Sequence, residues 1–75
     1  MNAESIADKI KRYRKINNMS QEELSTLSGI NVSTIKKYEC GYRNPKPDQL
    51  VKIANALNVS VLVFLSFDLT TTSDI

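Results

Sequence analysis

The chain has 75 residues, which suffice for one small domain and are too few for two independent cores. It contains one cysteine and no histidine, which excludes an intrachain disulfide and zinc sites built from histidine and cysteine. We therefore expect no metal and no other cofactor, and we expect the chain in the reducing cytoplasm. Residues 1–15 lack the apolar core of a signal peptide, and no segment approaches the ~18 apolar residues of a membrane span.

Charge is distributed unevenly along the chain. Residues 9–46 contain nine basic and three acidic side chains, a net charge of +6, whereas the remaining residues sum to −4. Such a local excess predicts a surface that faces a polyanion, although a basic helix face that is merely solvated is the alternative.

A first helix is predicted over residues 5–17. Ile6, Ile10 and Tyr13 recur at helical spacing and form one apolar stripe. Arg14 lies at the edge of that stripe, which is an unusual place for an arginine unless it has a partner.

A second helix is predicted from Ser20 to Gly29. The residues SQEE match a capping box, and Gly29 suits the left-handed conformation that ends many helices. Ser25 and Ser28 face inward in this helix, so their hydroxyls need backbone or water partners. Leu27 is expected to be partly exposed.

A third helix is predicted between Asn31, its N-cap, and Gly41, its end. Glu39 falls on the inner side of the helical wheel, just as Arg14 lies at the edge of the apolar stripe of the first helix. We therefore expect these two charged residues to form a buried ion pair. The inner side also holds Thr34, Ile35 and Tyr38, and the outer side holds Val32, Ser33, Lys36, Lys37 and Cys40.

A loop is predicted over residues 42–47 because this segment contains two prolines, and a fourth helix follows it. Pro47 suits the first turn, Asp48 is favourable near the positive end, and Asn58 can provide a left-handed exit. The predicted buried stripe consists of Leu50, Ile53, Ala54 and Leu57.

The last element, VLVFLSF, follows a cap at Ser60, and its pattern fits either a helix or a strand. As a helix it would place Val61, Phe64 and Leu65 in the core. That arrangement leaves Leu62, Val63 and Phe67 on other faces.

Five segments of residues 6–65 together resemble the Cro/phage-repressor-type helix-turn-helix family of DNA-binding transcriptional regulators. The segments are IADKIKRYRK, MSQEEL, SGINVSTIKKYECG, the Asn-Pro of YRNPKPDQL, and LVKIANALNVS. The resemblance implies an all-α fold of five helices, of the lambda-repressor type, in which the second and third helices form the helix-turn-helix. The domain would span residues 1–69, and residues 70–75 would be a polar, frayed tail.

The resemblance also assigns roles to individual residues. Arg14 and Glu39 match the pair that ties the first helix to the third, and Gln21 would reach a phosphate or orient the third helix. The residues facing base edges would be Val32, Ser33, Thr34 and Lys37. The other phosphate contacts would come from Lys36, Arg43, Asn44 and Lys46.

The partner implied is a near-palindromic double-stranded DNA operator bound by a homodimer. We expect repression by occlusion of polymerase, while activation stays open. Relatives usually carry acidic residues where this chain has Leu62 and Val63, so these two and Phe67 are candidates for a dimer contact, unless a further C-terminal segment covers them.

A competing hypothesis is a protein-interaction module, antitoxin-like or regulatory, that uses the apolar C-terminal element of the same fold. An enzyme is not expected. The sequence offers no histidine base, no glycine-rich phosphate loop and no nucleophile with a partner.

Overall fold

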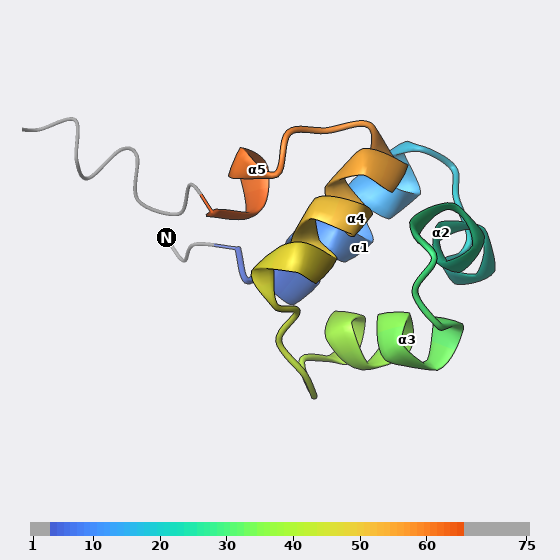
Figure 1. The fold of residues 1–75 in the computed structure, drawn as a ribbon, viewed down its shortest axis with the longest axis horizontal. Helices are drawn as coiled ribbons and strands as arrows, with labels where there is room; N and C mark the ends of the chain where they lie inside the picture. The colour runs from blue at the N-terminus through green and yellow to red at the C-terminus, as the bar shows by residue number, and fades with distance from the viewer. Residues whose placement is uncertain (1–3, 66–75) are drawn as a thin grey trace, which may run out of the picture.

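The computed structural model describes residues 4–65, and this range contains five helices and no strand (Figure 1). The predicted domain of residues 1–69 extends past both ends of this range, and the predicted tail of residues 70–75 lies outside it. The helices are α1 (Ile6–Ile16), α2 (Gln21–Ser28), α3 (Val32–Cys40), α4 (Pro47–Leu57) and α5 (Leu62–Leu65). Among the described residues, no helix is both long and apolar enough to cross a membrane.

The helix boundaries follow the predicted caps. At the start of α2, Ser20 N donates to Glu23 Oε1 at 2.8 Å and Glu23 N donates to Ser20 Oγ at 3.0 Å, which completes the capping box. Asn31 caps α3 through its side-chain oxygen. Gly29 and Gly41 end α2 and α3 with φ of 76° and 82°, a conformation in which a Cβ atom would be strained.

The core forms where the helices converge. In Figure 1, α1 and α4 overlie each other at the centre, and α3 runs beneath them. α1 packs against α3 and α4, and α2 packs against the same two helices. The buried hydrophobic residues are Ile10, Leu24, Ile30, Ile35, Tyr38, Leu50, Ile53, Ala54, Leu57 and Phe64.

The two serines of α2 find their partners in the backbone, as predicted. Ser25 Oγ donates to the Ile30 carbonyl, and Ile30 N donates to Ser28 Oγ at 3.2 Å. These bonds satisfy polar groups that would otherwise be costly to bury, and they hold the turn between α2 and α3 in one conformation. Leu27 is 61% exposed, also as predicted.

α5 is a helix of a single turn, and two predictions for its residues are wrong. Leu65 was expected in the core but is 41% exposed, whereas Val63 was expected on another face but is half-buried against the core. Phe64 fixes this arrangement, because its ring meets the Tyr13 ring edge to face at a centroid distance of 6.1 Å. Lys9 Nζ also donates to the Val63 carbonyl at 3.0 Å. The helical-wheel positions predicted for a longer helix therefore do not describe the side chains of this single turn.

The predicted pair of Arg14 and Glu39 ties α1 to α3. Arg14 Nε lies 2.7 Å from Glu39 Oε2, and Arg14 Nη2 donates to Glu39 Oε1 at 3.0 Å. Arg14 Nη1 donates to the Met19 carbonyl at 2.8 Å, so the same guanidinium also fixes the turn between α1 and α2. The two side chains are 12% and 3% exposed. The hydrogen bond to Glu39 raises the pKa of Arg14, against the opposing effect of burial.

Replacing Glu39 with alanine should destabilise the fold, because the Arg14 guanidinium would lose its partner in a nearly buried site. Stranding one member of a buried pair costs about 3 to 5 kcal/mol. Urea denaturation followed by circular dichroism measures the change in the free energy of unfolding.

The matched control is Glu4→Ala. Glu4 pairs with Arg12 at 2.7 Å, but this pair is exposed, with side-chain exposures of 37% and 45%. Exposed ion pairs of this kind contribute about 0 to 1 kcal/mol. Equal losses for the two variants would contradict the structural role assigned to Glu39.

Candidate nucleic-acid interface

The outer face of α3 presents most of the predicted DNA-facing residues. Ser33, Lys36 and Lys37 are exposed, and Val32 is half-buried beside them. The helix start is fixed because Asn31 Oδ1 accepts a hydrogen bond from Ser33 N at 2.8 Å. Thr34, which was predicted to face bases, is half-buried as Val32 is, and it also lines a hollow next to α4.

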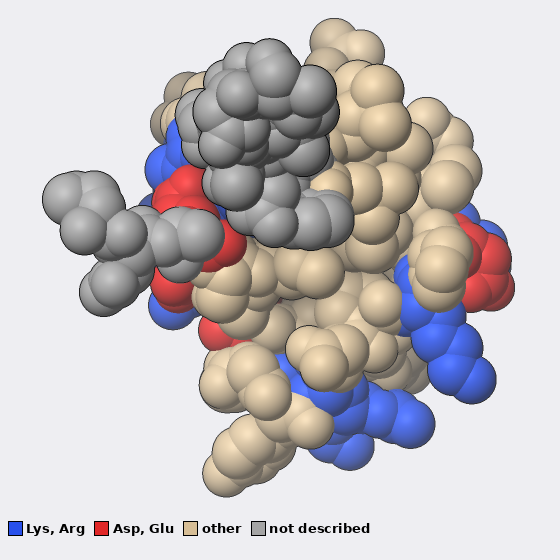
Figure 2. Space-filling view, turned by 90° about the vertical axis from the view of Figure 1, so that its left-hand side faces the viewer, with Lys and Arg blue, Asp and Glu red and all other residues tan. Residues whose placement is uncertain are grey.

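The loop after α3 adds polar and basic side chains to the same side of the molecule. Arg43, Asn44 and Lys46 are exposed, while Pro45 is buried and anchors the loop. In Figure 2, several basic side chains gather at the lower edge of the visible face, at the height of α3 and its following loop in Figure 1.

The cations of this surface are available to an external anion. Among the described residues 4–65, the ion pairs are Arg12 with Glu4 and Arg14 with Glu39. None of the cations that were predicted to meet DNA belongs to either pair, so their charges are not neutralised within this part of the chain. These cations are Lys36, Lys37, Arg43 and Lys46.

A hollow of about 440 Å³ lies between α3 and the start of α4. Besides Arg43 and Lys46, its lining includes Lys52 and Gln49, which the sequence analysis did not select. Gln49 Nε2 donates to Tyr38 Oη at 3.5 Å, and Gln49 Oε1 is buried without a partner among the described residues. Lys52 and Gln49 line the hollow because of where α4 lies relative to α3, and no local sequence pattern signals this position.

Gln21 orients α3, which is one of its two predicted roles. Its Nε2 donates to Glu39 Oε1 at 3.1 Å, so the amide joins the α2 start to the buried pair. One N–H of the amide is thus committed within the protein. A phosphate contact would have to use the second N–H from this anchored position.

In the described part of the chain, no three histidine, cysteine, aspartate or glutamate side chains come together as a possible metal site. Cys40 is exposed, as predicted for the outer face of α3.

Comparison with known proteins agrees with this geometry. Residues 10–64 match the HTH_3 helix-turn-helix family model. The chain is 41% identical over 58 residues to the control protein C.SmaI of Serratia marcescens, a match that spans 77% of this chain and 69% of that protein.

Two solved structures extend the similarity to three dimensions. The DNA-binding domain of the P22 C2 repressor gives a TM-score of 0.83 at 25% identity, covering 91% of this chain and 90% of that one. SinR, a master regulator for biofilm formation solved in complex with DNA, gives 0.76 at 34% identity, covering 80% of this chain and 97% of that one. The chain therefore belongs to the helix-turn-helix family, of the Cro/phage-repressor type that its sequence resembles.

Proposed function

We propose that this chain is a sequence-specific, double-stranded DNA-binding transcriptional regulator that reads the major groove with α3. The observation that carries the proposal is one surface on which the outer face of α3 and the following loop present four cations that have no ion-pair partner within residues 4–65. A duplex is a dense polyanion, and its major groove admits an α-helix. The similarity to SinR, which was solved with DNA, supports the same conclusion. The proposed activity is binding rather than catalysis.

The residues at the start of α3 that would read bases lack side chains that form bidentate hydrogen bonds with a base. Val32 can contact a thymine methyl group, and Ser33 can donate to or accept from a base edge. Lys37, one turn further, can reach a guanine edge or a phosphate. Because the outer face of α3 has no arginine, asparagine or glutamine, we infer that DNA shape supplies much of the specificity.

Phosphate contacts would position α3 in the groove. Lys36 lies on the helix, and Arg43, Asn44 and Lys46 lie in the loop that follows it. All four side chains are exposed. The N-terminus of α4 begins at Pro47, and its free amides and positive dipole end favour an anion nearby. The hollow is lined by Arg43, Lys46 and Lys52 together with the acidic Asp48, and its three cations to one carboxylate favour a backbone phosphate there.

We further propose a homodimer that places its two α3 helices in successive major grooves, about 34 Å apart, on a near-palindromic operator. Of the three candidate dimer residues, Leu62 is 63% exposed, Val63 is half-buried, and Phe67 lies outside the described residues. Leu65 adds a second exposed apolar side chain to α5. Repression by occlusion of polymerase in the bacterial cytoplasm is the proposed mode, and the similarity to the P22 C2 repressor supports it.

The alternative is a protein-interaction module whose working surface is the apolar side of α5. The exposure of Leu62 and Leu65 favours it. The two functions differ in their response to salt, since apolar docking does not release counterions from a duplex.

Duplex binding should weaken steeply with salt, and Lys46→Ala should reduce the slope. Each phosphate contact contributes about −0.9 to the slope of log affinity against log salt concentration. Fluorescence anisotropy titrations at several salt concentrations measure this slope. Lys15→Ala is the control, because Lys15 is exposed on α1 and belongs neither to α3 nor to the loop that follows it. Absence of binding at low salt would refute the DNA-binding function.

Val32→Ala should change the operator that is selected from a random duplex pool. Replacing the isopropyl group with a methyl group weakens the proposed thymine-methyl contact, and the preference for thymine should relax at one position of each half-site. Leu27→Ala on α2 removes a similar apolar surface away from α3 and should leave the selected sequence unchanged. An identical operator for Val32→Ala would exclude the proposed reading role.

Leu62→Glu should shift the protein from dimer to monomer, because a charge would be buried at the proposed contact between two copies. Sedimentation velocity measures the oligomeric state. Ile16→Glu is a matched control, since Ile16 and Leu62 are both 63% exposed. Binding to a single half-site should survive in both variants. If the wild-type protein were a monomer at micromolar concentration, the dimer proposal would be wrong. The proposal that one copy binds a half-site would still stand.

A further inference from the structure

One large side chain beside the proposed interface has no assigned role. Tyr42 follows Gly41 at the end of α3 and is 83% exposed, the highest value among the large hydrophobic residues of the described range. A tyrosine has an apolar ring and a polar hydroxyl, and its exposure leaves both available to another molecule.

The backbone at Tyr42 is held firmly by the end of α3. Tyr42 N donates to the Lys37 carbonyl at 2.9 Å, and Gly41 N donates to the Tyr38 carbonyl at 3.2 Å. Together with the φ of 82° at Gly41, these bonds form a Schellman motif. A residue in the position of Tyr42 commonly packs against the side chain of the residue in the position of Lys37. The facing residue here is a lysine, and the tyrosine ring remains in solvent.

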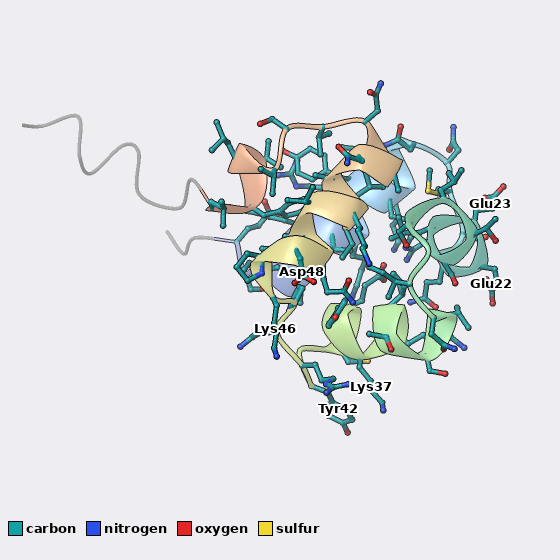
Figure 3. The ribbon with its side chains drawn as sticks, in the orientation of Figure 1. Glu22, Glu23, Lys37, Tyr42, Lys46 and Asp48 are labelled. Atoms are coloured by element: carbon teal, nitrogen blue, oxygen red, sulfur yellow. The ribbon has the colours of Figure 1, made fainter. Side chains whose placement is uncertain are left out.

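The direction of the side chain places it with the DNA-facing residues. In Figure 3, Tyr42 and Lys37 both point away from the core on the underside of α3. At ~1.5 Å per residue, the end of α3 at Cys40 lies roughly 12 Å from Val32, which is comparable to the ~12 Å width of the major groove, and Tyr42 lies two residues beyond that end. When Val32 meets a base edge, Tyr42 is therefore at the sugar-phosphate backbone that bounds the groove.

We propose that the Tyr42 hydroxyl donates a hydrogen bond to a backbone phosphate at the edge of the groove that α3 occupies. The inference rests on the proposed DNA-binding function and adds an uncharged contact to it. Tyrosine is among the side chains that bind phosphate oxygens in DNA complexes. Because the backbone is already fixed, binding has to order only the two side-chain torsions, which lowers its entropic cost.

Tyr42→Phe tests this contact, since it removes the hydroxyl and keeps the ring. Anisotropy titration should show affinity about tenfold weaker than wild type, the size expected for a hydrogen bond to a charged group. The loss should be similar on the selected operator and on a random duplex, because a phosphate contact carries no base information. The salt slope should stay unchanged, since the lost group is neutral. Ile16→Ala, an exposed apolar truncation on α1, should bind like wild type.

Duplexes with one phosphate replaced by a neutral methylphosphonate locate the contact. The penalty of Tyr42→Phe should disappear for one modified position in each half-site and persist at the others. The inference would be overturned if the affinity of Tyr42→Phe lay within twofold of that of wild type, or if no modified phosphate removed the penalty. In either case, binding by the wild-type protein would still support the DNA-binding function. Absence of wild-type binding would overturn both.

Discussion

The position of α3 depends on one buried carboxylate. Glu39 accepts hydrogen bonds from Arg14 on α1 and from Gln21 at the start of α2, and Arg14 also holds the turn between those helices. A helix of nine residues is too short to be stable alone in water. Three elements therefore meet at a side chain on the inner face of α3, and on the outer face Ser33, Lys36 and Lys37 remain exposed.

This division of α3 explains how a surface of such ordinary residues can serve recognition. Ile35, Tyr38 and Glu39 are buried and determine where the helix lies, so the exposed side chains need not hold it in place. Affinity can then come from lysines and arginines that see only the phosphate backbone. Discrimination can rest on a small contact such as the one proposed for Val32, because the orientation of the helix is fixed before any base is reached.

The sequence predicted the parts of the fold that short-range chemistry determines. The capping box at Ser20, the left-handed exits at Gly29 and Gly41, and the pairing of Arg14 with Glu39 follow from spacing along one or two helices. The faces of α5 were not predictable in the same way, because a single turn is oriented by the contact of Phe64 with Tyr13 across the fold. The contributions of Lys52 and Gln49 to the hollow beside α3 likewise depend on where α4 lies, which no local pattern encodes.

The separation of the two faces of α3 also has a consequence for divergence among regulators. Ser33, Lys36 and Lys37 are exposed, so changes at these positions are nearly neutral for stability and can alter binding preference freely. Val32 is the exception, because it is half-buried and a larger replacement would have to displace neighbouring atoms. Duplicated copies of such a gene could acquire new operators by a few substitutions on one helix, and the same route is open to laboratory retargeting of this scaffold.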